Sequence, residues 1–218
     1  ARVGKLSATV HLAAFLNRKC LMFGRVEAED LLFQLAIEPD STYGNNLTRV
    51  LKLVSSGKES KMPLDSIFTV NRLKVKNAHF RMLNFNYKSS YEHGMNWGDL
   101  DVHADITGHG IGFWGGRMHA VADKITAYEK SGFDVLELSG KCHVGMGKTE
   151  LHDMRLRDGS GSDINLPRAV LSYYGTEAWS NFVHEVNMDI DFNPSRLVLE
   201  SISNFSGGTF RGCKFKTD

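Results

Sequence analysis

The feature that most constrains the fold is an alternation of apolar and polar residues in the second half of the chain. From Asp99 to Ile106, and again from Val186 to Phe192, every second residue is apolar. Because successive side chains of a β-strand point to opposite faces, this period of two predicts strands with one apolar face each. Weaker forms of the pattern predict further strands at Met118–Ile125, Phe133–Leu138, Lys141–Met146, Thr149–Leu156 and Ser162–Ser172. Glycine-bearing breaks such as Gly108–Gly116 and Gly159–Gly161 are expected to separate neighbouring strands. Strands that follow one another in this way favour a meander.

Helical signals are few. In the first sixty residues, strands are predicted at Val3–Val10 and Cys20–Glu27, with a helical turn between them at Leu12–Lys19. Asn45 or Asn46 is typical of a helix N-cap, and the short helix that it begins is expected to end at Gly57. Thr176 is expected to cap another short helix.

An all-β chain with two or three short helices poses a physical problem, because so few helices cannot cover the apolar faces of about ten strands. A curved antiparallel β-sheet, a β-taco, solves it as an open hydrophobic groove filled by something apolar. A closed β-sandwich solves it by packing the apolar faces together. Periodicity alone does not choose between the two. In the groove architecture, residues 1–60 form a strand and short-helix cap region, and residues 61–218 form the β-groove region continuous with it.

The composition of the chain limits the classes of binding partner and site that we expect. The 26 basic and 25 acidic residues nearly cancel, so there is no basic excess to neutralise a phosphate backbone, and nucleic acid is not expected as a partner. Cys20, Cys142 and Cys213 are too few and too widely spaced for a disulfide framework or a zinc knuckle. The longest apolar run, Leu12–Leu16, is far shorter than the roughly 20 residues that cross a bilayer.

One glycine-rich stretch resembles part of a phosphate-binding loop. Gly145–Thr149 ends in Gly-Lys-Thr, but Cys142 stands where such a loop requires its first glycine. The segment that follows, Glu150–Arg157, alternates like a strand and does not open a helix whose N-terminal amides would hold phosphate. We therefore expect a hairpin turn here.

Histidines and aspartates raise the question of a metal. Three histidines lie near three aspartates in the sequence, and both side-chain types are zinc ligands: His103, His109 and His119 with Asp101, Asp105 and Asp123. Their spacing, however, matches no recognised pattern of zinc ligands. His103 shares a strand face with the two nearest aspartates, and a solvated polar face explains all three. No metal or other cofactor is expected. No hydrolase nucleophile motif is visible either, so the chain is not expected to be an enzyme.

Five segments, in order along the chain, carry a resemblance to a known family: Phe68–Phe80, Met95–Ile106, Glu129–Phe133, Ser162–Pro167 and Pro194–Leu199. On these segments the chain resembles the TamB-like translocation and assembly module proteins of Bacteroidetes-type bacteria, a branch of the AsmA-like superfamily. The most particular matches are Glu129–Phe133 after a strand and Ser162–Pro167 after a glycine-rich turn. In Glu129–Phe133 the ordinary interpretation is a turn in which Gly132 supplies an unusual backbone angle.

The resemblance implies a non-catalytic, membrane-proximal periplasmic part of a longer protein, anchored in the inner membrane by a segment outside this sequence. Its implied function is to conduct phospholipid between the inner and outer membranes during envelope biogenesis. An alternative is an assembly factor for outer-membrane proteins, with an outer-membrane β-barrel as partner. A closed sandwich would instead imply a scaffold or adhesion module that binds protein through its edges and loops.

Under the groove hypothesis, one set of apolar positions is expected to contact phospholipid acyl chains. These groove positions are Leu100, Val102, Ala104, Ile106, Leu136, Leu138, Val144, Ile164, Leu166, Met188, Ile190, Phe192, Leu197 and Leu199. Copies of the chain are also expected to pair through open sheet edges.

Overall fold

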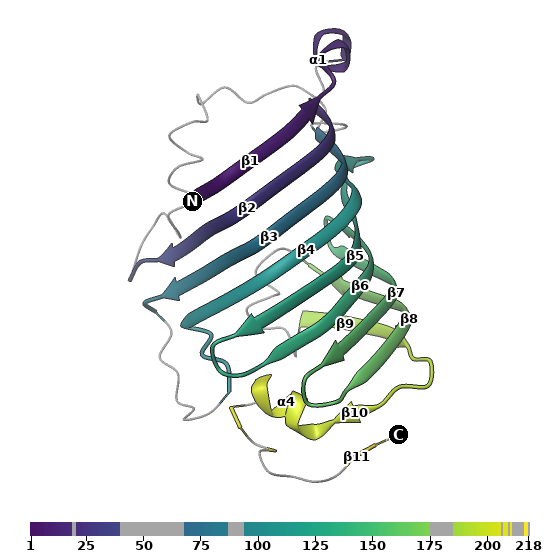
Figure 1. Ribbon diagram of the computed structural model, residues 1–218. Helices are drawn as coiled ribbons and strands as arrows, with labels where there is room; N and C mark the ends of the chain where they lie inside the picture. Colours follow the sequence, from purple (N-terminus) through teal and green to yellow (C-terminus); the bar gives the residue numbers. More distant parts are fainter. Residues whose placement is uncertain are drawn as a thin grey trace.

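A computed structural model describes residues 1–18, 21–39, 68–86, 94–174, 185–205, 207, 208, 210, 216 and 217. Its main feature is one nine-stranded sheet in which the strand order follows the chain, from β1 to β9 (Figure 1). The strands of this sheet are β1 Arg2–Val10, β2 Leu21–Ile37, β3 Phe68–Asn84, β4 Asp99–Trp114, β5 Arg117–Glu129, β6 Asp134–Gly145, β7 Lys148–Asp158, β8 Asp163–Tyr173 and β9 Val186–Asp191. Four short elements complete the described structure: α1 Leu12–Arg18, β10 Leu197–Val198, α4 Leu199–Phe205 and β11 Lys216–Thr217.

The sheet is open and curved. Figure 1 shows β1 to β4 as a broad wall from which β5 to β9 bend away, so that β1 and β9 are the two edges of a trough. The all-β prediction and the prediction of an open, curved sheet are therefore confirmed. The closed-sandwich alternative is wrong, because the described strands do not close into a barrel and the second sheet among them is only the β10–β11 pair.

The prediction of a wholly antiparallel sheet is wrong at one place. β2 and β3 pair in parallel, Leu21 with Phe68 through to Ile37 with Asn84, whereas the other neighbours in the sheet are antiparallel. A parallel pair needs a connection of a dozen or more residues, and β2 ends at Ile37 while β3 begins at Phe68, so the sequence is long enough between them. Both strands of the first sixty residues, β1 and β2, belong to the same sheet as the rest.

Two predicted strand breaks differ from the structure. The break predicted over Gly108–Gly116 exists but is shorter, since β4 runs on to Trp114 and the turn uses only the last two glycines. The predicted break between Leu138 and Lys141 is absent because β6 is continuous there. Gly140 has a φ of 139°, and a Cβ at this position would lie 2.9 Å from the Cα of Met154. Glycine therefore permits a close approach of two strands at this position, instead of making a turn.

The short helix predicted at Leu12–Lys19 is confirmed as α1. The helices expected at Asn45–Gly57 and after Thr176 fall on residues outside the described ranges. No helix in the described ranges is long and apolar enough to cross a membrane.

Among the described residues, one compact cluster of buried apolar side chains lies where α4 meets the sheet. Met95, Leu100 and Phe133 are buried there, with Met82 and Val135 packed against them. The ring of Phe205, the last residue of α4, meets that of Phe133 edge to face with centroids 4.9 Å apart. The backbone N–H of Met95 donates to the carbonyl of Asn204 at 2.7 Å, which fixes α4 against this end of the sheet.

Candidate functional site

The strand register places apolar residues in a continuous row across most of the sheet. Each member is the Cα partner of the next on the neighbouring strand, in the order Leu6, Ala28, Val75, Ile106, Ile125, Leu138, Leu156 and Ile164. We call this set the apolar row. It runs from β1 to β8 and gives one face of the curved sheet a continuous apolar surface.

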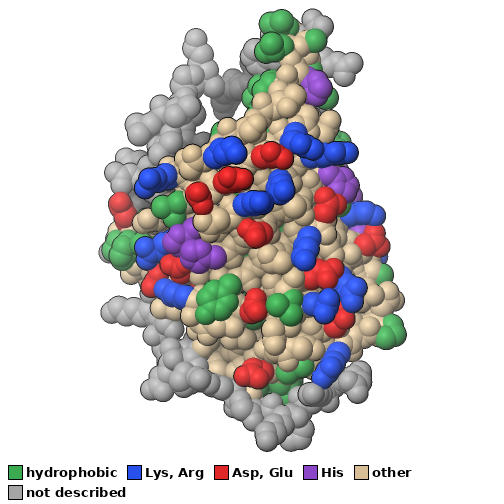
Figure 2. Space-filling view, in the orientation of Figure 1, with side chains coloured by type: hydrophobic (Ala, Val, Ile, Leu, Met, Phe, Trp, Pro, Cys, Tyr) green, Lys and Arg blue, Asp and Glu red, His purple; other side chains and the backbone are tan. Residues whose placement is uncertain are grey.

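A shift of one residue along the strands gives the opposite character. The adjacent row reads Ser7, Glu27, Lys74, Thr107 and Lys124. Figure 2 shows this face over β1 to β5, where basic, acidic and histidine side chains dominate. Because neighbouring residues of a strand point to opposite faces, the sheet separates an apolar face from a charged face.

Ion pairs cover the charged face. They include Lys141 with Asp153 at 2.7 Å and Arg168 with Asp189 at 2.8 Å. The hydrogen bond that Lys148 donates to Glu150 lowers the pKa of that carboxyl, with nitrogen and oxygen 2.6 Å apart. Charges that are paired and solvated in this way suit a surface that stays in water.

The apolar face lacks a packed second layer in the described part of the chain. None of the described large side chains is less than 2% exposed. In the apolar row only Ala28 and Val75 are buried, whereas the members from Ile106 onward are half-buried and Leu6, on the edge strand, is 64% exposed. A folded domain usually buries such residues fully, so this face has apolar surface left to cover.

The predicted groove residues fall into three groups. Most lie in strands on the apolar face, and among these are Val102, Ala104, Ile106, Leu138, Val144, Ile164, Leu166, Met188 and Ile190. Leu100 shares that face but is only 8% exposed, within the closed cluster under α4. Leu136 is 45% exposed beside a register irregularity between Val135 and Glu137, so alternation does not assign its face.

The third group lies outside the strands of the large sheet. Leu197 belongs to β10, Leu199 begins α4, and Phe192 follows the last residue of β9. Leu197 and Phe192 still line a shallow depression of about 550 Å³ together with Ile164. Leu197 and Leu199 are therefore not in the large sheet, because after β9 the chain forms the short β10 strand and α4.

Several members of the apolar face were not among the predicted positions. Val75, Ile125 and Leu156 are the clearest, since each is an interior member of the apolar row. The period-two pattern placed the last two in predicted strands, but their alignment with Ile106 follows only from the register.

Three non-glycine residues with positive φ, in β2, β3 and β7, keep the two faces of the sheet separate. Asp30, Asn77 and Asp153 have φ angles of 55°, 52° and 53°. Asn77 sits at a β-bulge, so Lys76 and His79 share the charged face although they are three positions apart. The side-chain amide of Asn77 donates to Oδ1 of Asp30 at 2.6 Å, which ties two of these positions together. Asp and Asn tolerate this backbone conformation better than other non-glycine residues.

Two buried carboxylates stabilise turns, one within Glu129–Phe133 and one just before Ser162–Pro167. Glu129 is 3% exposed, and it accepts hydrogen bonds from the backbone N–H groups of Ser131 at 2.7 Å and Asp101 at 3.3 Å. Gly132 has a φ of 102°, as predicted for this turn. Asp158, also 3% exposed, accepts from the backbone N–H of Ser162 at 2.8 Å. The contacts in these segments are therefore structural.

The hairpin predicted at Gly145–Thr149 is confirmed. β6 ends at Gly145 and β7 begins at Lys148, with Met146 fully exposed in the turn between them. Glu150 and the residues after it are in a strand, so this loop does not lead into a helix whose N-terminal amides could hold phosphate.

Cys142 is the one free cysteine in the described ranges. It lies on the apolar face in a second cross-strand set, Ala120, Cys142, Leu151, Ala169 and Ile190. Burial raises the pKa of its thiol. The side chain therefore acts as a small apolar group in this position.

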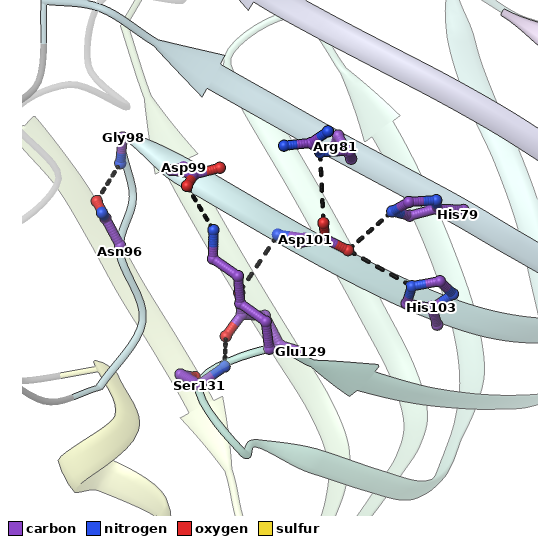
Figure 3. A network of polar contacts seen from close by, with 10 residues as sticks. His79, Arg81, Asn96, Gly98, Asp99, Asp101, His103, Glu129 and Ser131 are labelled. Atoms are coloured by element: carbon purple, nitrogen blue, oxygen red, sulfur yellow. Dashed lines mark hydrogen bonds and ion pairs between the residues drawn. The ribbon is translucent and has the colours of Figure 1, made fainter.

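The histidines considered as metal ligands have separate partners. Nδ1 of His109 lies 2.7 Å from Asp123 Oδ1, and the ring of His119 stacks on Trp114 with centroids 4.0 Å apart. His103 lies instead beside Asp101 and His79 (Figure 3). Sequence reasoning missed His79 as a member of this group, because only the β3–β4 register brings it there.

Comparison with known proteins adds no relative: no protein-family model, curated protein or solved structure matches this chain.

Proposed function

We propose that this chain is a lipid-conducting segment of a TamB-like envelope protein, located in the periplasm as part of an inner-membrane-anchored chain. It carries phospholipid between the two membranes without catalysing a reaction. The observation that supports the proposal best is the apolar row, which crosses eight strands on one face of an open sheet and is half-buried from Ile106 onward.

The dimensions of the row suit acyl chains. Strands lie about 4.8 Å apart, so seven intervals give a path of roughly 34 Å along the sheet. One acyl chain spans about half of a 30 Å hydrocarbon core. An acyl chain lying along the row would therefore contact about half of it. The other half offers the same kind of apolar contacts, so the lipid could move along the row.

The energetics favour occupation of this face. Burial contributes about 0.8 kcal/mol for each methylene, so about eight methylenes contribute roughly 6 kcal/mol before ordering costs. The ion pairs that Lys141 and Arg168 form with Asp153 and Asp189 lie on the charged face, so acyl chains on the apolar face would leave them intact. The polar head group would stay in water beyond the apolar surface.

A matched pair of substitutions on β4 tests the proposal. Ile106 is in the apolar row, and Thr107 beside it faces Lys74 and Lys124 on the charged face. We expect the wild-type protein, purified from bacterial cells, to retain phospholipid in native mass spectra. Ile106→Asp should lose that lipid while its circular dichroism stays that of a folded sheet, and Thr107→Asp should keep it.

Two results would contradict the proposal. One is a lipid-free wild-type protein that also takes up no phospholipid from added vesicles. The other is equal lipid retention by Ile106→Asp and Thr107→Asp. If Ile106→Asp simply unfolds, Ile190→Asp on edge strand β9 provides a second test of the same face.

A further inference from the structure

Two histidines stand directly opposite each other on the charged face. His79 of β3 and His103 of β4 are Cα partners in an antiparallel pair. Their rings stack with centroids 4.1 Å apart and an interplanar angle of 17°. Cross-strand neighbours on one face are close enough for both side chains to reach one small ligand.

A carboxylate completes the group. Asp101 precedes His103 by two positions and so points to the same face. Its Oδ1 lies 2.8 Å from Nε2 of His79 and 3.5 Å from Nε2 of His103. Its Oδ2 lies 3.3 Å from Nε of Arg81. Figure 3 shows both imidazoles on one side of the carboxylate and the arginine on the other.

Solvent has access to this group. The side chains of His79, Asp101 and His103 are 30%, 22% and 51% exposed. A depression of about 330 Å³ adjoins both histidines and is lined by Asp30 and Asn77 among others. There is therefore a route for a hydrated ion and room for waters that stay bound to it.

We propose that His79, His103 and Asp101 bind a divalent transition-metal ion, with zinc the best fit. The possible ligand atoms of these three side chains all lie within 4.8 Å of one another. Among the described residues, no other group of three histidine, cysteine, aspartate or glutamate side chains is this close. Two imidazole nitrogens and one carboxylate oxygen are ligands that zinc takes in three-ligand sites, where water fills the fourth position. Arg81 would hold the second carboxylate oxygen and orient Asp101, as outer partners of metal ligands do.

The site is independent of the proposed lipid function. It lies on the charged face, whereas acyl chains would occupy the apolar face. Arg81 adds a positive charge beside the ion, so the affinity should be lower than that of a four-ligand structural zinc site. The bound metal would link β3 to β4 across the sheet.

Isothermal titration of the chelator-treated, full chain with zinc chloride tests the proposal. We expect one saturable event with one zinc ion per chain. His79→Ala and His103→Ala should each weaken it about tenfold or more. His109→Ala is the matched control, because it removes a histidine paired with an aspartate at 2.7 Å on the same face; it should leave the affinity unchanged. Lowering the pH from about 7.5 to about 5.5 should weaken binding, since protons compete for imidazole nitrogen.

A second control addresses the other histidine neighbours in the described ranges. His143 lies between His119 and His152, with ring centroids 4.7 Å and 5.7 Å away. The proposal is overturned if zinc binding is absent, if it is unchanged in both His79→Ala and His103→Ala, or if His143→Ala removes it. Thermal unfolding in chelator should give the same midpoint for His103→Ala and the wild type, which separates lost binding from lost folding.

Discussion

Leu100 and Ile106 stand on the same strand, β4, and on the same face of the sheet, yet their surroundings differ. Leu100 is 8% exposed in the cluster that Phe133 and Met95 form under α4. Ile106 is half-buried in the apolar row, where the described residues place no second layer over it. The same alternation thus produces a closed core at one end of the strand and an apolar surface in its middle. What differs is that the cluster at Leu100 packs under α4, whereas no described element covers Ile106.

The largest expected effect separates these two positions. Leu100→Asp buries a carboxylate without a partner in the closed cluster, and it should lower the free energy of unfolding by at least about 4 kcal/mol. Ile106→Asp should lower it by only about 1 to 2 kcal/mol, because water can reach the new carboxylate. Urea unfolding followed by circular dichroism measures both. Equal losses would mean that the two positions are equally closed and that Ile106 is core.

A buried carboxylate tests the closed end from the opposite direction. Glu129→Ala leaves the backbone N–H groups of Ser131 and Asp101 without their acceptor. It should lower the free energy of unfolding by about 3 kcal/mol. Glu137 is the control. Its carboxylate is 3.5 Å from Arg157 on the charged face, and Glu137→Ala should cost less than about 1 kcal/mol. A Glu129→Ala variant as stable as Glu137→Ala would show that the turn does not depend on this carboxylate.

The smallest effect is a pH dependence on the charged face. Burial lowers the pKa of His143 below its ordinary value of 6.5, and the neighbouring His119, His152 and Arg117 lower it further, while Glu150 opposes them. The unfolded chain therefore takes up a proton at this residue more readily than the folded one, so stability falls as the pH drops from 6.5 through the lower folded pKa.

His143→Gln removes this proton uptake. As the pH is lowered from about 7.5 to about 5.5, the thermal unfolding midpoint of the variant should rise relative to that of the wild type. A constant difference across that range would assign the acid sensitivity to other residues.

Much of the fold could be predicted from the sequence, because alternation in segments such as Asp99–Ile106 encodes strands directly. The parallel pairing of β2 with β3 could not, since alternation says nothing about strand direction. Gly140 was misjudged because glycine serves both turns and close strand contacts, and only the position of Met154 distinguishes the two.

The candidate site was predictable in kind but not in detail. An apolar face followed from the period of two, but the members of the apolar row follow from the register of eight strands. The difference between Leu100 and Ile106 depends on α4, which lies far along the chain, so no local pattern carries it. The pairing of His79 with His103 has the same origin in register.

The most direct test of the central claim is site-specific photo-crosslinking to lipid in cells. A photoreactive phenylalanine analogue replaces Leu138, a member of the apolar row, or its neighbour Ser139, which faces Arg155 on the charged face. The proposed function predicts phospholipid adducts, detected by mass spectrometry after irradiation, at position 138 and not at position 139. Equal labelling at the two positions, or none at position 138, would contradict the claim that the apolar face of the open sheet carries lipid.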